Sequence, residues 1–330
     1  MPANLPPQYS KAEEEFRQAS SPAERLDKLR EMFRLLPKHK GTEKLQSDLK
    51  QKISRCRDEA EQAKQGGKKS GPSYRVPRDG AGQVVLLGGT NVGKSSLLAS
   101  LTKARPEVAP YPFTTRTPQP GMMAWHDVWV QIVDLPPITA DFFEPWQLGI
   151  IRSADTVALV VNLGDDDLID AVNTVLNRLD GYHTQLVGSV PFDQEDEAVM
   201  HLRTVVIANQ SDAPAAEVRL ELLREFLGER FEIVLASAQT GAGLQGVRDQ
   251  LFRLLDVIRI YTKTPGKPAD RTNPYTLPVG STVLDLARVI HQDLEQSLKY
   301  ARIWGSGIFD GQTVKRDHEL QDGDMVEIHT

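Results

Sequence analysis

Short apolar runs separated by helix-like stretches dominate the middle of the chain. Runs of this length bounded by turn residues predict buried strands, whereas apolar positions three or four residues apart predict helices. Strand and helix alternate from Gln83 to about Asp256, which is typical of a largely parallel sheet covered by helices. The predicted strands are residues 84–87, 128–133, 156–162, 204–208 and 233–235, and the predicted helices are residues 96–101, 168–179 and 243–256.

Two helices are predicted ahead of this region. The first begins at Ser21-Pro22, an N-cap followed by a proline at the first helical position. The segment 37–41 then breaks the helical pattern, and Thr42 can cap a second helix. We therefore predict an antiparallel helical hairpin with the cationic turn Lys38-His39-Lys40 at its tip. Its apolar positions are Leu26, Leu29, Phe33 and Leu36 in the first helix, and Leu45, Leu49, Ile53, Cys56, Ala60 and Ala63 in the second.

A smaller α+β unit is predicted at the C-terminal end. It contains a strand at 258–262, a helix at 282–294 with Leu284, Ala287 and Ile290 on one face, and short strands at 299–304, 312–314 and 325–328. Two other stretches lack a clear period. Residues 66–82 are rich in Gly, Pro, Lys and Ser and are predicted to form a linker, and residues 180–201 are predicted to be an insertion.

These patterns divide the chain into four parts: a helical hairpin (1–65), a linker (66–82), an α/β domain (83–257) and an α+β domain (258–330). The sequence is 40% hydrophobic and 25% charged, as is usual for soluble proteins. It has no apolar run of membrane-spanning length, its N-terminus is polar, and Cys56 is its one cysteine. These features predict a protein of the reducing cytoplasm.

Charge is unevenly distributed along the chain. The net charge is −6, but residues 1–80 carry 18 basic and 12 acidic side chains, and the remainder carries 21 and 33. A basic head on an acidic body suggests an anionic partner for the head, such as RNA. For the hairpin tip the alternative is a solvated turn that stabilises the helix ends, and charge alone favours that alternative.

The strongest chemical signal is Gly88–Ser95 (GGTNVGKS), which fits the phosphate-loop pattern GxxxxGK[ST] between a predicted strand and a predicted helix. Its glycines permit backbone conformations that a Cβ disfavours, so the loop N–H groups and the helix N-terminus can point at phosphate oxygens. Lys94 is predicted to reach the β- and γ-phosphates, and the Ser95 hydroxyl to hold Mg²⁺. The predicted phosphate-site residues are Gly88, Gly89, Thr90, Asn91, Val92, Gly93, Lys94, Ser95 and Ser96.

Two further segments supply oxygen atoms for a metal ion. Asp134 ends a predicted strand close to the phosphate loop, which is where a Mg²⁺-organising aspartate belongs. The proline-rich segment 111–118 carries Thr114 and Thr115, and a mobile loop with hydroxyls can close over a γ-phosphate and add an oxygen to Mg²⁺. The predicted metal ligands are therefore Ser95, Thr115 and Asp134, with Thr114 as the second choice for the threonine.

Guanine is the predicted base. Asn209-Gln210-Ser211-Asp212 follows a predicted strand, and Asp212 can accept two N–H donors from a guanine edge, an arrangement that adenine does not offer. The loop at Ser237-Ala238 can place a backbone N–H against the guanine oxygen. The predicted base-site residues are Asn209, Gln210, Asp212, Ser237 and Ala238.

Taken together, these segments resemble the Obg–HflX-like superclass of translation-factor-type GTPases, most closely the developmentally regulated GTP-binding proteins. The quoted motifs are PKHKGTEKL, GGTNVGKSSLL, YPFTT, DLPP, NQSD and SAQTGAGL. The segments RIYTKTPGKPAD, LPVGSTVLDLARVIH, KYARIWGSG and ELQDGDMVEI are similar to that family's TGS domain, a ubiquitin-like β-grasp fold. The resemblance covers nearly the whole chain and implies a P-loop GTPase domain between a helical hairpin and a TGS domain.

The resemblance also implies an activity: slow, potassium-stimulated hydrolysis of GTP to GDP in a protein that binds ribosomes or RNA through its basic hairpin and TGS domain. Asn91 stands where potassium-responsive members keep an asparagine, so a K⁺ ligand role is carried over to it. Thr115 matches the threonine expected to reach Mg²⁺. The residues expected to support catalysis are Lys94, Thr115 and Asn91.

Three departures from the family pattern bear on function. Pro137 replaces a glycine whose N–H contacts the γ-phosphate, and proline has no N–H. Gln210 replaces a lysine whose stem packs on the base. The insertion 180–201 is too short for the extra domain of the developmentally regulated proteins. No glutamine follows DLPP either, so water activation would fall to Mg²⁺, Lys94, K⁺ or a partner.

Three functional hypotheses follow. The first is a GTP-hydrolysing, ribosome- or RNA-associated switch. The second is a degenerate nucleotide-binding module with little hydrolysis that serves as an interaction scaffold, as Pro137 and Gln210 suggest. The third is an ATPase, since one relative in the superclass prefers ATP; Asp212 favours GTP over this reading.

Overall fold

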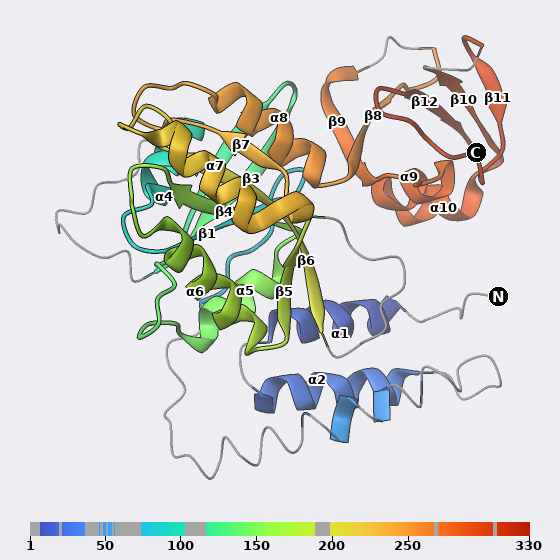
Figure 1. Cartoon of the computed structure of the whole chain (residues 1–330). Coiled ribbons are helices and arrows are strands. Elements are labelled where there is room, and N and C mark those ends of the chain that lie inside the picture. The colour runs from blue at the N-terminus through green and yellow to red at the C-terminus, as the bar shows by residue number, and fades with distance from the viewer. Residues whose placement is uncertain are drawn as a thin grey trace.

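The computed structural model describes residues 7–19, 22–36, 46, 49–50, 52–54, 56, 74–102, 117–188, 199–266, 270–305 and 309–330. Within these ranges the chain forms a helical N-terminal segment, a seven-stranded domain and a five-stranded domain (Figure 1). The predicted cationic turn Lys38-His39-Lys40 and the predicted Mg²⁺-binding hydroxyls of Thr114 and Thr115 lie outside the described residues.

Two described helices pack side by side at the N-terminal end, α1 (Pro7–Gln18) and α2 (Pro22–Leu35) (Figure 1). The sequence predicted α2 but not α1, which also contacts α5 of the seven-stranded domain. The predicted second helix of the hairpin is described only at residues 46, 49–50, 52–54 and 56, all of which are helical. The buried core shared by these helices is Tyr9, Ala12, Leu26, Leu29, Met32, Leu36, Leu49 and Cys56.

The larger sheet has the strand order β2-β3-β1-β4-β6-β5, with β7 paired to β6. Among the described strands of this sheet, only β2 runs antiparallel to its neighbour, so the predicted largely parallel sheet is confirmed. Its strands are β1 (Gln83–Leu87), β2 (Gln119–Trp125), β3 (Val128–Asp134), β4 (Thr156–Asn162), β5 (Thr184–Val187), β6 (Met200–Asn209) and β7 (Ile233–Leu235).

Helices cover both faces of this sheet, because successive residues of a buried strand point to opposite sides. In β1, Val85 and Leu87 belong to one core and Val84 and Leu86 to the other. The first core takes its helical partners from α5 (Pro145–Ser153), α6 (Leu168–Asp180) and α7 (Ala216–Leu227), and the second from α4 (Lys94–Leu101) and α8 (Leu244–Leu254). A short 3₁₀ turn, η2 (Gly228–Arg230), follows α7.

The smaller sheet has the order β11-β10-β12-β8-β9 and is mixed, with β8 and β12 parallel. Its elements are β8 (Val257–Thr262), β9 (Asp270–Pro278), α9 (Val283–Ile290), α10 (Gln292–Ser297), β10 (Tyr300–Trp304), β11 (Gln312–Val314) and β12 (Met325–His329). Val283, Leu286 and Ala287 of α9 are buried against the sheet, and Leu284 is only half-buried.

Two element predictions were wrong. The predicted single helix 282–294 is two helices, since His291 is extended and its ring Nδ1 accepts a hydrogen bond from the Asp293 N–H at 3.1 Å, which caps α10. The predicted insertion 180–201 contains β5, and β6 already begins at Met200, so this segment contributes an edge strand to the sheet.

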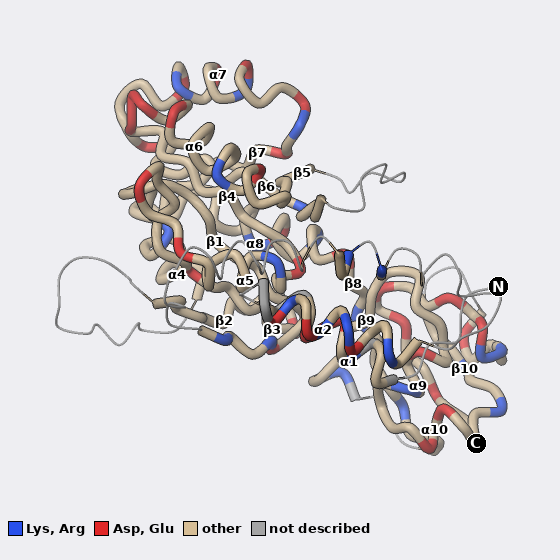
Figure 2. Tube along the Cα trace, turned by 90° about the horizontal axis from the view of Figure 1, so that it is seen from below, with Lys and Arg blue, Asp and Glu red and all other residues tan. Residues whose placement is uncertain are grey.

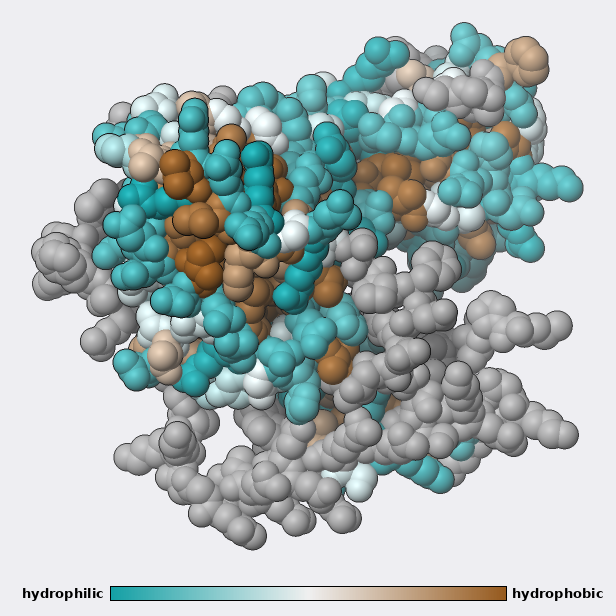
Figure 3. Space-filling model, viewed as in Figure 1, coloured by the Kyte–Doolittle hydropathy of each residue, from teal (hydrophilic) through white to brown (hydrophobic). Residues whose placement is uncertain are grey.

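The surface carries mixed charge and one conspicuous apolar ridge. Figure 2 shows basic and acidic residues interspersed along the described chain. Figure 3 shows apolar side chains reaching the surface over α7, where Val218, Leu222 and Phe226 are exposed. No described helix combines the length and the apolar character needed to cross a membrane.

Candidate functional site

The loop between β1 and α4 has a backbone shape that requires glycine at two positions. Gly88 has φ 151°, and a Cβ there would lie 2.5 Å from the Val160 carbonyl oxygen. Gly93 has φ 86°, and a Cβ there would lie 2.4 Å from the Asn209 side-chain nitrogen. The conformation and the close approach of neighbouring chain therefore exclude larger residues at both positions.

Lys94 is buried at the start of α4 and is held inside the loop. Its Nζ donates hydrogen bonds to the carbonyl oxygens of Gly88 at 3.2 Å and Gly89 at 2.9 Å. Burial lowers the pKa of Lys94 to about 8, with nearby Asp134 opposing the shift. The ammonium group thus lies inside the loop and has lost much of its hydration. An anion bound beside it would stabilise its positive charge.

Ser95 and Asp134 meet across the end of the sheet. The Ser95 hydroxyl donates a short hydrogen bond to Asp134 Oδ2, while Asp134 Oδ1 is buried without a hydrogen-bond partner among the described residues. Burial raises the pKa of Asp134, against the lowering effects of the Ser95 hydrogen bond and of Lys94. A buried carboxylate oxygen with an unused lone pair beside a hydroxyl is the donor set that a hard divalent cation prefers.

Asn209 joins the loop to the predicted base site. Its Nδ2 donates to the Val92 carbonyl at 3.0 Å, and its Oδ1 accepts from the Ala238 N–H at 3.0 Å. Because β1, β6 and β7 are parallel, their carboxyl ends lie at one edge of the sheet, where a doubly wound fold binds ligands. Ser237, fully buried, accepts a hydrogen bond from the Thr240 N–H at 3.0 Å and fixes this turn.

Other predicted site residues are exposed at the same edge. Asn91 has φ 57° and is exposed, and its side chain makes no hydrogen bond with the described residues. Thr90, Ser96 and Asp212 are exposed as well. Gln210 has φ 59°, and its side-chain oxygen packs against Gly164. Gln210 is half-buried, whereas a ligand can reach the exposed side chains of Thr90, Asn91, Ser96 and Asp212 from solvent.

The segment after Asp134 is fastened to the phosphate loop. The Ile138 N–H donates to the Gly88 carbonyl at 3.1 Å, and the Gln147 side chain donates to the Pro136 carbonyl at 3.0 Å. Pro137, between them, has no N–H to offer. The first backbone donor after the DLPP motif is thus already used within the chain.

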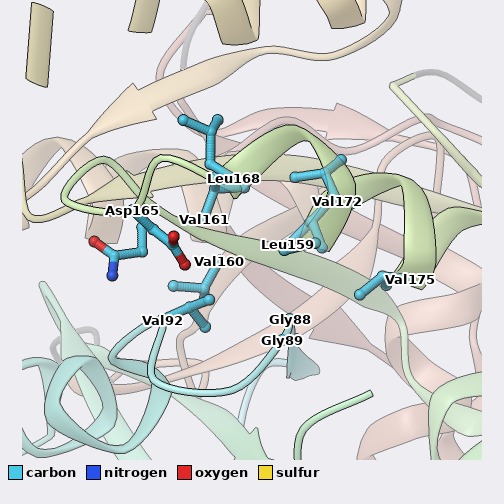
Figure 4. Close-up of a pocket in the computed structure, with 12 residues that line it drawn as sticks. Gly88, Gly89, Val92, Leu159, Val160, Val161, Asp165, Leu168, Val172 and Val175 are labelled. Carbon is cyan, nitrogen blue, oxygen red and sulfur yellow. The ribbon is translucent and has the colours of Figure 1, made fainter. Parts of the chain in front are cut away.

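The space behind the loop is small. A cavity of about 10 Å³ lies between Gly88-Gly89 and α6, and Figure 4 shows Leu168, Val172 and Val175 of α6 on its far side. Such a volume holds about one water molecule. This space is therefore too small for a phosphate group.

Three residues that support this edge were not predicted. Asn162 ends β4 in register with Asn209, and its Oδ1 accepts from the Gly164 N–H at 2.7 Å. Arg219 donates to the Leu163 and Pro214 carbonyls and so holds the loop that carries Asp212. Ser100 donates to the Ala238 carbonyl at 3.0 Å. Only Asn162 had a sequence signal, since it is a polar residue at the end of a predicted parallel strand.

Two family models match separate parts of the chain. Residues 83–190 match the family described as 50S ribosome-binding GTPase, and residues 258–330 match the TGS domain. Together they cover the phosphate loop, Asp134 and the whole five-stranded domain.

Several named proteins are similar along most of their length. An uncharacterized GTP-binding protein of Methanocaldococcus jannaschii is 27% identical, covering 92% of this chain and 92% of its own. Developmentally-regulated G-protein 3 of Arabidopsis thaliana is 28% identical over 88% and 94%, and Developmentally-regulated GTP-binding protein 1 of Xenopus laevis is 26% identical over 85% and 91%. The first alignment extends over 363 positions, so that relative carries residues that this 330-residue chain lacks.

Among solved structures, a GTP-binding protein from Pyrococcus horikoshii superposes with a TM-score of 0.53 at 16% identity, covering 75% of this chain and 99% of its own. The YchF GTPase of Schizosaccharomyces pombe gives 0.51 at 12% identity, covering 78% and 100%. At these identities the likeness concerns the fold.

Proposed function

Because the chain is an Obg/DRG-like protein that combines a GTPase domain with a TGS domain, we propose that it binds GTP and GDP at the Gly88–Ser95 loop and hydrolyses GTP slowly. The observation that carries the proposal is the single edge at which Lys94, Asp134 and Asn209 converge. The loop amides and Lys94 would bind the phosphates, and Asp212 with the Ser237-Ala238 turn would select guanine.

Mg²⁺ fits the donors that this chain provides. Asp134 Oδ1 has no partner among the described residues, and the Ser95 hydroxyl lies beside it. We propose these two residues as Mg²⁺ ligands. Thr115, which precedes β2 in the sequence, is proposed as a third. The ion would neutralise phosphate charge during phosphoryl transfer. Lys94 would also neutralise phosphate charge, from within the loop. We propose Asn91 as a K⁺ ligand because its exposed side chain is free to turn toward a bound nucleotide.

The alternative, a nucleotide-binding module with little hydrolysis, is favoured by one specific observation. Pro137 has no N–H, and the next donor, that of Ile138, is bonded to the Gly88 carbonyl. Neither Pro137 nor Ile138 therefore offers a free backbone donor to a γ-phosphate in the described conformation. Equal affinities for GDP and a non-hydrolysable GTP analogue would support this alternative.

Phosphate release from GTP in Mg²⁺ buffer separates the two functions. It should be measured in KCl and in NaCl, with and without ribosomes, beside a Lys94→Ala control. We expect turnover above the control that is faster in KCl. Turnover equal to that of Lys94→Ala under every condition would exclude the hydrolytic function, and equal rates in the two salts would remove the K⁺ role of Asn91.

We further propose that the protein is cytoplasmic and that it associates with ribosomes or RNA through its basic N-terminal hairpin and its TGS domain. The charge of residues 1–80 and the ribosome-binding family that matches the GTPase domain support this. Replacing Lys38 and Lys40 together by Glu should weaken RNA association and reduce its salt dependence, because fewer counterions are released. If the dependence of RNA affinity on salt were unchanged, the hairpin tip would be only a solvated turn with no part in RNA binding.

A further inference from the structure

The two sheet domains are joined at the tip of the β2–β3 hairpin. Asp127, in the turn of this hairpin, accepts a hydrogen bond from Arg259 Nη1 at 2.9 Å and another from the Tyr261 hydroxyl. Arg259 and Tyr261 both lie on β8, the first strand of the TGS domain. A charged residue of one domain thus contacts two residues of the other, and we call Asp127, Arg259 and Tyr261 the clamp.

Arg259 is fixed on the TGS side. Its Nη2 and Nε donate to the Asp322 carboxylate at 2.8 and 3.1 Å, and its backbone N–H donates to the same group at 2.7 Å. Its guanidinium also lies 5.0 Å from the ring centroid of Trp125, at the end of β2. The Arg259 side chain is only 18% exposed, whereas the Asp322 side chain is 43% exposed.

The hairpin tip is also fixed to the GTPase domain. The Trp125 ring stacks on Phe252 of α8 with centroids 3.6 Å apart, and its Nε1 donates to Asp249 at 2.8 Å. Trp125 therefore lies between α8 and the TGS arginine. A displacement of the tip would disturb both neighbours at once.

The opposite end of the same hairpin lies at the proposed nucleotide site. The ladder runs from Gln119 opposite Asp134 to Trp125 opposite Val128 without a register shift. β3 ends at Asp134, one of the three proposed Mg²⁺ ligands, and a second, Thr115, precedes β2 by four residues in the sequence. A regular antiparallel ladder moves as a unit, because slippage breaks its hydrogen bonds and reverses its side chains.

Beside the clamp the domains are separated by a cleft of about 570 Å³, lined by Met122 and Trp129 of the hairpin and by Asn273, Pro274 and Thr276 of β9. Trp129 is 48% exposed there. The clamp and the contact of Arg259 with Trp125 lie beside this cleft, and a junction with an open cleft beside it can pivot more easily than a broad packed interface.

We propose that the β2–β3 hairpin couples the nucleotide at one end to the position of the TGS domain at the other, through the clamp. This coupling rests on the proposed nucleotide function and specifies its regulation. It is reciprocal by thermodynamic necessity: if GTP and GDP favour different hairpin positions, the clamp favours one nucleotide over the other. Breaking the clamp should then change the ratio of the two affinities by about fivefold or more.

The test compares Asp127→Ala with Asp322→Asn. The first removes both hydrogen bonds of the clamp, whereas the second weakens a partner of Arg259 inside the TGS domain and leaves Asp127 in place. Affinities for GDP and a non-hydrolysable GTP analogue are measured by calorimetry for full-length wild type and both variants. We expect the affinity ratio to change at least fivefold in Asp127→Ala and less than twofold in Asp322→Asn.

Hydrogen exchange supplies a second readout. Exchange at residues 257–263 should differ between the two nucleotides in the wild type and become independent of nucleotide in Asp127→Ala. Tyr261→Phe removes one hydroxyl and should shift the affinity ratio in the same direction, which guards against misfolding of the alanine variant. Normal nucleotide affinities with an unchanged ratio in both Asp127→Ala and Tyr261→Phe would overturn the coupling alone. Absence of nucleotide binding in the wild type would overturn the proposed function, and the coupling with it.

Discussion

At the scale of single residues, the phosphate loop shows how much of its shape is imposed by its surroundings. Gly93 is required both by its φ of 86° and by the Asn209 side chain that would meet a Cβ at 2.4 Å. Gly89, four residues earlier, has no such restriction, because a Cβ there would be 3.6 Å from its nearest neighbour, Ala171. The pattern GxxxxGK[ST] predicts a glycine at position 93. It does not reveal that the Asn209 side chain also excludes a Cβ there.

This contrast gives a matched pair of variants. Gly93→Ala should destabilise the protein by about 1–3 kcal/mol, because an alanine would be held at positive φ and would displace Asn209. Gly89→Ala should cost no more than about 1 kcal/mol, since ordinary van der Waals contact awaits its methyl group. Urea unfolding of both variants measures the difference. Equal destabilisation by the two would contradict the described loop conformation.

Asp134 combines a proposed role with a cost in stability. Its pKa is raised by burial, so its ionised form is less favourable in the folded than in the unfolded protein. Asp134→Asn should therefore raise the melting temperature of the nucleotide-free protein while abolishing the Mg²⁺ dependence of nucleotide affinity. Thermal unfolding without metal, together with titrations in Mg²⁺ and in EDTA, checks both parts. A lower melting temperature would show that the charge stabilises the fold.

At the scale of elements, the sequence predicted the buried strands and the edge strands β7 and β11, but it missed the edge strands β2, β5 and β9. β1 and β4 are nearly continuous apolar runs because helices cover both faces of their sheet, and β3 is apolar apart from Gln131 and its final Asp134. β2 and β9 were missed because each contains proline, at Pro120 and at Pro274, and proline is tolerated only where one side of a strand has no partner. α1 has few apolar residues, and its packing against α2 and α5 is a tertiary effect that no local pattern records.

The location of the candidate site was also predictable from the pattern of buried strands. Its residues follow buried parallel strands, so their position at one edge comes from the strand order. The contacts that Asn209 makes on both sides, the use of the Ile138 N–H, and the supporting role of Arg219 depend on loops whose conformation is set by distant residues. Local spacing does not specify such contacts.

One side of α7 is exposed and the other is buried in the core. We call its exposed apolar residues, Val218, Leu222 and Phe226, the α7 ridge. Val218, Leu222 and Phe226 are 58%, 49% and 42% exposed, whereas Leu223 is fully buried. Changing Leu222 and Phe226 together to Gln should alter the free energy of unfolding by about 0.5 kcal/mol or less per site. Leu223→Ala should cost about 2–5 kcal/mol. Denaturant unfolding tests this, and a loss of several kcal/mol in the double variant would mean that the ridge is covered in solution.

At the scale of the whole molecule, an ion pair between Asp127 and Arg259 links the two sheet domains. Protonation of Asp127 would weaken this link, so the junction is sensitive to acid. Burial acts to raise the pKa of Asp127, but hydrogen bonds from Tyr261 and Arg259 prevail and lower it below its ordinary value of 3.8. The groups that face it are Arg259, Tyr261 and Asp322 from the TGS domain, with His126 beside it in the turn. Such a depressed pKa contributes stability above pH 3.8 that is lost as the pH falls through the folded value.

The difference in stability between wild type and Asp127→Asn should therefore be constant from about pH 5 upward and should shrink in more acidic solution. Thermal unfolding of both proteins across this range measures it, and the Asp322→Asn variant reports the other carboxylate bound to Arg259. A difference that grows on acidification would contradict the assigned charge state of Asp127.

The most direct test of the account is calorimetric titration of the full-length protein with GDP and Mg²⁺, beside Lys94→Ala. We predict saturable binding of one nucleotide per chain in the wild type, weakened at least tenfold by Lys94→Ala and competed by GTP but not by ATP. Absence of binding heat at all temperatures tested, or equal binding by Lys94→Ala, would contradict the claim that the Gly88–Ser95 loop is a guanine-nucleotide site.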